Sequence, residues 1–249
     1  MQRKAVMKKI SLALASALTL VMAPASADLV FNPAFNTTGT GLGAVQTVVT
    51  LQDGSGRPGT IQNNGLESGC TTYNPGNPSN PTFNCFAGLQ GGDNQAINNT
   101  YFLSDVSGLT SAGDLALVVN INEPGNDDSA VLTDLYLSLF AAGSATPIAT
   151  FTYTGPDLLL TESGGIGNSG TYRFTLDAAQ AAEAIAACPV LANCVVGAGV
   201  QFLEGSTSGG IETVYVQSFT GGNPVPEPGS MALLGLGAAG LLAARRRKR

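Results

Sequence analysis

The sequence predicts an all-β domain, an antiparallel β-sandwich of jelly-roll-like form with one short helix. Several short segments alternate apolar and polar residues with a period of two, which is the pattern of a half-buried strand. The segments between them are rich in turn-forming residues, and the 249-residue chain contains 32 glycines and 13 prolines. Short strands separated by frequent turns are typical of a sandwich.

The strand pattern is clearest beyond residue 115, whereas residues 28–113 are rich in loops and contain one clear strand. In residues 132–140, three leucines share one predicted face, while Asp134, Tyr136 and Ser138 share the other. The predicted strands are 44–51, 115–121, 132–140, 148–153, 171–176, 195–202 and 212–219.

One helix is predicted at residues 178–187, where nearly every residue is a good helix former. Asp177 stands at the N-cap with Gln180 three residues later, a capping box in which Asp replaces the usual Ser or Thr. Pro189 follows the predicted end. The apolar stripe expected to cover one end of the sandwich is Ala181, Ala184, Ile185 and Cys188.

Residues 1–27 have the composition of a secretory signal peptide. Four basic residues lie before or at the start of the apolar stretch 10–21, and Ala25 and Ala27 supply the small residues of a cleavage site. An apolar stretch of about 12 residues is shorter than the ~20 needed for a membrane-spanning helix. Cleavage by signal peptidase after Ala27 is therefore predicted, and 28–223 is expected to form one extracytoplasmic domain.

The charges are divided unevenly along the chain. The full chain has a net charge of −6, but residues 28–223 contain only two basic residues, Arg57 and Arg173, against sixteen acidic ones. The resulting charge of about −14 repels phosphate backbones, so no nucleic-acid partner is expected.

Four cysteines in an exported chain predict two disulfides rather than a metal site. Three connectivities are open. The local pairs Cys70–Cys85 and Cys188–Cys194 are favoured, because each lies within one polar segment containing Pro or Gly.

The chain has no histidine, so neither a Ser-His-Asp nor a Cys-His nucleophile can be built, and an enzyme is not expected. No cofactor is expected either. A hydrolase based on two carboxylates is a third and weaker reading, because sixteen acidic residues make some carboxylate pair inevitable.

Two weak binding signals are present in the predicted domain. Tyr73 and Tyr101 lie in loop-rich regions, where exposed rings could bind carbohydrate. The loop after residue 121 carries oxygen ligands of the kind calcium prefers, although the same residues are ordinary in a tight turn. The candidate calcium ligands are Asn122, Glu123, Asn126, Asp127 and Asp128.

The chain ends in an apolar segment followed by a basic cluster. Residues 229–244 would form a helix about 24 Å long, short of the ~30 Å hydrocarbon core, although snorkelling arginines can close the gap. We therefore expect a single transmembrane helix. The basic residues 245–249 place its end in the cytoplasm and the acidic domain outside.

The sequence of this tail is more specific than its hydropathy. The run Val225-Pro226-Glu227-Pro228, the Leu- and Gly-containing helix and the terminal basic cluster, in that order, resemble the PEP-CTERM sorting signal of Gram-negative bacteria. The resemblance covers residues 224–249, about a tenth of the chain. It implies that a membrane-embedded exosortase recognises the region of Pro226, Glu227 and Pro228 and removes the helix.

The same resemblance implies a destination. The protein would be anchored transiently in the inner membrane and then delivered to the cell surface or extracellular matrix, in association with exopolysaccharide in biofilm or floc. A structural or adhesive role is the leading interpretation. The alternative is a binding module for carbohydrate or calcium.

Overall fold

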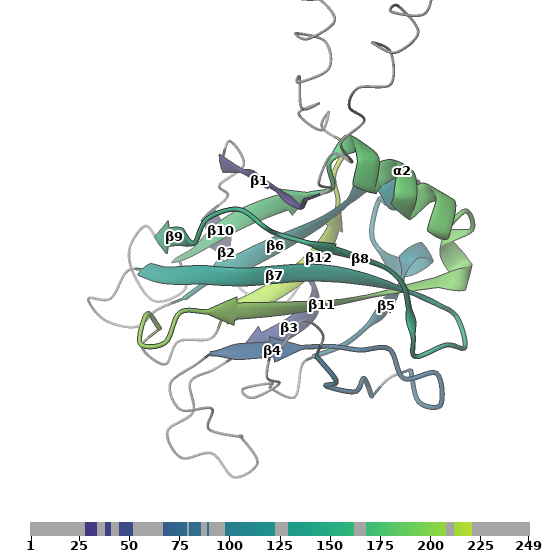
Figure 1. Cartoon of the computed structure of the whole chain (residues 1–249), viewed down its shortest axis with the longest axis horizontal. Coiled ribbons are helices and arrows are strands. Elements are labelled where there is room, and N and C mark those ends of the chain that lie inside the picture. The colour runs from purple at the N-terminus through teal and green to yellow at the C-terminus, as the bar shows by residue number, and fades with distance from the viewer. Residues whose placement is uncertain are drawn as a thin grey trace, which may run out of the picture.

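Two antiparallel sheets pack face to face in the computed structural model (Figure 1). The residues that it describes are 28–33, 38–40, 45–51, 67–78, 80–85, 89, 98–122, 129–161, 168–207 and 212–220. The predicted signal peptide, sorting segment and transmembrane helix lie outside these ranges. Among the described helices, none combines the length and the hydropathy of a membrane span.

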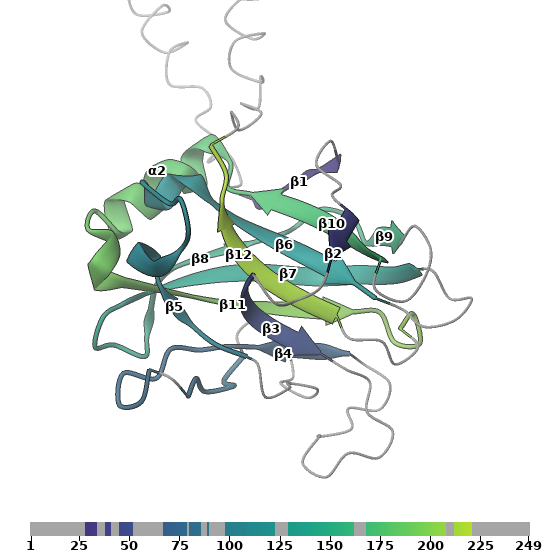
Figure 2. The same cartoon turned by 180° about the vertical axis from the view of Figure 1, so that it is seen from behind.

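Sheet A, nearer the viewer in Figure 2, has the strand order β1-β10-β6-β12-β3, and β2 also pairs with β10. Sheet B, nearer the viewer in Figure 1, has the order β4-β11-β7-β8, with β5 on β11 and β9 on β7. The strands of sheet A are β1 (Val30–Asn32), β2 (Thr38–Thr40), β3 (Gln46–Leu51), β6 (Leu115–Ile121), β10 (Asn168–Thr175) and β12 (Glu212–Ser218). Those of sheet B are β4 (Ser68–Cys70), β5 (Tyr101–Phe102), β7 (Ser129–Ala141), β8 (Pro147–Thr152), β9 (Leu158–Thr161) and β11 (Cys194–Phe202).

The predicted strands are confirmed, with shifted ends. Residues 115–121 form β6 as expected, whereas β7 extends well beyond the predicted 132–140. The strands that the sequence did not predict are short: β1, β2, β4, β5 and β9 each have two to four residues. A segment of that length is too short to display a period of two.

The core lies between the inner faces of the two sheets. The leucines of β7 at 135, 137 and 139 meet Val214 and Val216 of β12 and Phe174 of β10 in one cluster of buried side chains. Tyr172 also ties the sheets together, because its hydroxyl accepts a hydrogen bond from the Thr161 amide at 2.6 Å and donates one to the Thr161 carbonyl. Burying this continuous apolar surface is the main source of stability.

The outer face of sheet B is also apolar and covered. Tyr136 and Ser138 were predicted on the face opposite the leucines, and they are there, but both are at most 1% exposed. Tyr136 packs against Cys70 and Leu89, while Phe140 packs in a second small cluster with Tyr73. The chain after β4 therefore returns across this face.

The outer face of sheet A is mainly polar, with Ala116 and Val118 of β6 as buried apolar exceptions. Thr50, Thr213 and Asn120 are cross-strand neighbours on β3, β12 and β6, and all three are at most 6% exposed. Their side-chain oxygens Oγ1, Oγ1 and Oδ1 have no hydrogen-bond partner among the described residues. Nearby, the side-chain oxygen of Gln217 accepts from Nε and Nη2 of Arg173 at 2.7 and 2.8 Å, in the amide orientation that the hydrogen-bonding pattern favours.

Helix α2 (Ala178–Ala187) confirms the predicted capping box. The Asp177 carboxylate accepts from the Gln180 amide at 2.7 Å, and the Gln180 side chain accepts from the Asp177 amide at 3.2 Å. The helix contacts β8 and the 3₁₀ turn η4 (Ala112–Asp114) at one end of the sandwich (Figure 1). Ile185 was predicted on the buried stripe, but it is 48% exposed, and its side chain lies close to Gly113.

Both favoured disulfides are confirmed. Cys70–Cys85 closes the segment after β4, which we call the stapled segment (residues 70–85). Cys188–Cys194 joins the end of α2 to the start of β11 across the 3₁₀ turn η5 (Leu191–Asn193). Neither disulfide links the two sheets. Each one instead closes a short loop and fixes that loop against the sandwich.

Candidate functional site: a pocket at the edge of strand β5

A pocket of about 380 Å³ lies at the end of the sandwich where β5 forms an edge of sheet B. Its walls come from parts of the chain that are far apart in sequence: the start of β3, the stapled segment, the β5 region with the 3₁₀ turn η3 (Leu103–Asp105), and β11. Its lining residues are Gln46, Tyr73, Pro78, Asn99, Thr100, Tyr101, Phe102, Asp105 and Val195. The β5 strand and the stapled segment lie side by side in both Figure 1 and Figure 2.

The aromatic wall follows from the geometry of β5. Adjacent residues of a strand face opposite sides, so Tyr101 packs against the main core while Phe102 packs against the cluster on the outer face of sheet B. Both rings are half-buried. The Tyr73 ring meets Phe102 nearly edge-on, with 6.3 Å between ring centroids. Because β5 is an edge strand, ring surface from both of its sides reaches the same pocket.

Tyr73 corrects one of our expectations. The sequence placed it in a loop-rich region where its ring could be exposed, but its side chain is only 3% exposed. It packs between Phe102 and Phe140, which lies 6.3 Å away between ring centroids. The ring therefore supports the pocket wall and is not a free platform. Tyr101, the other tyrosine singled out, does line the pocket with part of its surface exposed.

The stapled segment reaches the pocket in an ordered form. Thr72 and Thr82 form an antiparallel bridge with both backbone hydrogen bonds, at 2.8 and 2.9 Å. Asn74 turns the chain at the tip, because its side-chain oxygen accepts from the Gly76 amide at 3.1 Å and its carbonyl accepts from the Asn77 amide. Together with the Cys70–Cys85 disulfide, these bonds fix where Tyr73 and Pro78 stand.

Gln46 joins the two sheets at the pocket. Its Nε2 donates to the Asp105 carbonyl at 2.5 Å, and its Oε1 accepts from the Ser107 amide at 3.0 Å. The amide thus holds the turn η3 against the start of β3. Asn99 stands next to it, accepting at its side-chain oxygen from the Thr100 amide at 2.8 Å. These contacts make the polar wall rigid before any ligand arrives.

The charge at the pocket is negative. Asp105 is exposed, and the hydrogen bond found for its carboxylate is a long one, accepted from the Ser104 hydroxyl at 3.4 Å. Arg173 is the only Lys or Arg in the described ranges, and it is held on the outer face of sheet A. Burial raises the pKa of Tyr101, although a hydrogen bond with the Asn99 side chain acts the other way, so this phenol stays a protonated donor at neutral pH.

Thr100 adds a buried hydroxyl to the pocket wall. The residue lines the pocket and is 7% exposed, and its Oγ1 has no hydrogen-bond partner among the described residues. The residue therefore forms part of the buried wall of the pocket.

Several predicted site residues fall outside the described ranges. Of the candidate calcium ligands only Asn122 is described, and Glu123, Asn126, Asp127 and Asp128 are not. The same holds for Ala25 and Ala27 at the predicted signal cleavage site and for Pro226, Glu227 and Pro228. Among the residues that are described, no group of three or more metal-ligating side chains occurs.

Gln46, Asn99 and Asp105 are pocket residues that sequence reasoning missed. Gln46 and Asp105 lie 59 positions apart, and nothing in their local sequence links them. The available signal was weak: Tyr101 lies in a polar run close to Asn99 and Asp105. Only the pairing of β5 with β11 brings this run to the edge that faces β3.

A model of the PEP-CTERM protein-sorting motif matches residues 224–248. The chain ends in a PEP-CTERM motif. This confirms the resemblance drawn from Pro226-Glu227-Pro228 and the basic end. The motif implies an exported protein that is sorted to the cell surface and processed by exosortase. The match covers the tail alone, and the comparisons found no curated protein and no solved structure that match the chain.

Proposed function

We propose that residues 28–223 form a structural or adhesive component of the cell surface or extracellular matrix. Signal peptidase would release the N-terminus after Ala27. The chain would then stay in the inner membrane until exosortase acts near Pro226, Glu227 and Pro228. The single observation that carries the proposal is the PEP-CTERM motif at 224–248.

The chemistry of the domain supports this destination. Two disulfides suit an oxidising compartment outside the cytoplasm, where they persist. A charge of about −14 on residues 28–223 keeps such a domain soluble and away from anionic polymers. The chain also crosses between the sheets repeatedly, from β6 to β7, from β9 to β10 and from β11 to β12, which supports a jelly-roll-like frame.

A binding role fits the pocket better than a hydrolytic one. Hydrolysis of a glycosidic bond uses two carboxylates on either side of the scissile bond. Among its described lining residues the pocket has one carboxylate, Asp105. We therefore propose a domain without enzymatic activity, in which any adhesive contact is made by non-covalent binding.

The test is intact-mass analysis and terminal sequencing of the protein isolated from its native host. We expect an N-terminus at Asp28, a C-terminus near Pro226 to Pro228, and a gain of four hydrogens on reduction, two for each disulfide. The variant Glu227→Ala should keep the tail, whereas Glu204→Gln, an exposed carboxylate in the domain, should be processed normally. A mature wild-type chain that still ends at Arg249 would falsify the sorting proposal.

The adhesive role needs a test of its own. Cells lacking the protein should aggregate or retain matrix less than cells that express it, and expression of the wild-type chain should restore the difference. Equal aggregation by the two strains would remove the adhesive role and leave surface sorting in place.

A further inference from the structure

We propose that the β5 pocket binds an uncharged pyranose sugar, with Tyr101 and Phe102 contacting the ring and Asp105 accepting hydrogen bonds from its hydroxyls. This inference deepens the proposed adhesive function and rests on it for its biological setting. The pocket's volume of about 380 Å³ lies near the lower end of the range for small-molecule sites, ~300 to 1,000 Å³. One or two sugar rings are the class of ligand that this space admits.

The charge of the pocket favours a neutral ligand over an acidic one. Its described lining contains one carboxylate and no cation. A uronic acid or a phosphorylated sugar would bring a second negative charge to Asp105 with no arginine or lysine to balance it. An uncharged sugar avoids this repulsion, and its hydroxyl protons match a carboxylate that only accepts hydrogen bonds.

The arrangement of apolar and polar walls selects a ligand that has both kinds of surface. Tyr101 and Phe102 contribute half-buried ring surface to the lining, and Gln46, Asn99 and Asp105 contribute polar groups. A pyranose has an apolar face of C–H groups and a rim of hydroxyls. The protonated Tyr101 phenol adds donor and acceptor capacity at the same place.

The pocket is built before the ligand binds. Gln46 fixes η3 through its two hydrogen bonds, and the Cys70–Cys85 disulfide fixes the segment that carries Tyr73 and Pro78. Such preorganisation lowers the entropy lost on binding. Reduction of that disulfide should therefore weaken binding, whereas loss of Cys188–Cys194, whose cysteines do not line the pocket, should matter less.

The experiment is titration of the natively purified protein with a defined panel of sugars, followed by calorimetry and by saturation-transfer NMR. The neutral probes are glucose, galactose, mannose, N-acetylglucosamine, cellobiose and lactose, and the charged comparators are glucuronic acid and glucose 6-phosphate. We expect at least one neutral probe to bind, and glucuronic acid to bind at least about tenfold more weakly than its neutral parent.

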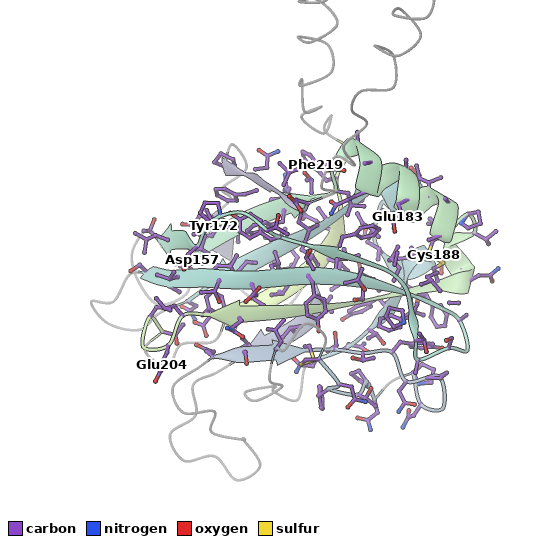
Figure 3. All side chains as sticks on the ribbon, in the orientation of Figure 1. Asp157, Tyr172, Glu183, Cys188, Glu204 and Phe219 are labelled. Atoms are coloured by element: carbon purple, nitrogen blue, oxygen red, sulfur yellow. A yellow bond between two sulfur atoms is a disulfide. The ribbon has the colours of Figure 1, made fainter. Side chains whose placement is uncertain are left out.

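Matched variants locate the site. Asp105→Asn and Tyr101→Ala should each weaken binding by about tenfold or more. Asp105→Asn removes an exposed charge and keeps the backbone carbonyl that holds Gln46, so its fold should be intact. The controls Asp157→Asn and Glu204→Gln change exposed carboxylates at the other end of the sandwich from β5 and should bind like the wild type (Figures 1 and 3).

Three outcomes would overturn the inference. They are no binding of any neutral probe, equal binding of glucuronic acid, and wild-type affinity in both Asp105→Asn and Tyr101→Ala. Surface delivery is measured on the same variants, so the two proposals can fail separately. A wild-type protein that reaches the surface without binding sugar refutes the pocket alone, whereas one that binds sugar but never leaves the cell refutes the proposed function.

Discussion

The outer faces of the two sheets differ in the kind of side chain that they present. On sheet B, Tyr136 and Phe140 turn large rings away from the core, and part of the chain outside the sheet packs over them. On sheet A, the outward positions hold mostly polar side chains, among them threonines, Asn120, Arg173 and Gln217, with Ala116 and Val118 of β6 as apolar exceptions. Sheet B therefore works as the middle layer of three. The outer face of sheet A is mainly polar, but many of its side chains, such as Thr213 and Asn120, are buried as well.

The difference explains where the glycines of β11 stand. A Cβ on Gly199 would come within 2.2 Å of the Tyr136 ring, and one on Gly197 within 2.4 Å of the Thr71 carbonyl oxygen. Side chains at these two outward positions would push the third layer off the sheet. The absence of side chains at Gly197 and Gly199 is what lets the stapled segment approach β11 closely enough to build the pocket.

The largest expected difference in stability is between variants of the two outward-facing tyrosines, Tyr136 and Tyr215. Tyr136→Ala on sheet B removes a ring that is 1% exposed and should lower the free energy of unfolding by about 3 to 5 kcal/mol. Tyr215→Ala on sheet A removes a half-buried ring and should lower it by about 1 to 2 kcal/mol. Urea denaturation of the two variants measures both values. Equal losses would contradict the three-layer description of sheet B.

The next effect concerns the two disulfides. Replacing Cys70 and Cys85 together by serine opens a loop with a sequence separation of 15 and should cost about 3 kcal/mol. The same change at Cys188 and Cys194, with a separation of 6, should cost about 2 kcal/mol. Thermal unfolding of both double variants, with and without reductant, gives the ranking. A larger loss at Cys188–Cys194 would show that the stapled segment holds itself in place without its disulfide.

A third prediction tests the close approach at β11. Gly199→Ala should lower the free energy of unfolding by about 1 to 3 kcal/mol, because the buried Tyr136 ring has little room to move. Gly76→Ala is the matched control, since the nearest atom to its added Cβ is 3.5 Å away. That variant should stay within about 0.5 kcal/mol of the wild type. If Gly199→Ala leaves the free energy of unfolding unchanged, the Tyr136 ring can move aside with little loss of stability.

The smallest expected effect comes from Asp134, which lies on the outer face of sheet B beyond the part that the stapled segment covers. Asp134 shares the outward side of β7 with Tyr136 but is exposed, and partial burial and then the charge of Asp157 raise its pKa above the ordinary 3.8. A raised carboxyl pKa means that the folded protein binds this proton more tightly than the unfolded chain does. The stability it contributes is therefore fully present below pH 3.8 and is lost as the pH rises through the folded pKa.

Asp134→Asn should consequently raise the melting temperature slightly at pH 7 and leave it unchanged below pH 3.8. The difference between wild type and variant across this pH range is the measurement, because the other carboxylates titrate in both proteins. A variant that is less stable at pH 7 would show that the carboxylate makes a favourable contact in its charged form.

The sequence predicted the parts of this fold that depend on local signals. The α2 capping box needs only Asp177 and Gln180. The long strands β7, β10 and β12 display a period of two, while β6 and β11 are recognisable as mainly apolar runs of seven and nine residues. The third layer was missed, because alternation along β7 says which residues share a face but not what packs on it. Tyr136 and Asp134 point to the same side of β7, yet Tyr136 is buried and Asp134 is exposed.

The candidate site was predictable only in fragments. Tyr73 and Tyr101 were named from the sequence, and Cys70–Cys85 was paired correctly, but none of these showed that the two tyrosines line one pocket. Gln46 and Asp105 meet because β3 and β5 belong to different sheets whose edges lie at the same end. Such a meeting depends on tertiary packing, on which local periodicity carries no information.

The scarcity of cations has a consequence for survival outside the cell. All four lysines, at positions 4, 8, 9 and 248, lie in the two terminal segments, so a mature chain of residues 28–223 offers proteases of tryptic specificity only Arg57 and Arg173. Arg173 lies inside β10, paired on one side with β1 and on the other with β6, and its side chain rests over the Phe219 ring at 4.6 Å. A protease must bind its target as an extended, unpaired strand, which this residue cannot become without opening sheet A. Because residues 28–223 contain no lysine, the N-terminal amine would be the one amine of such a chain that amine-reactive reagents can modify.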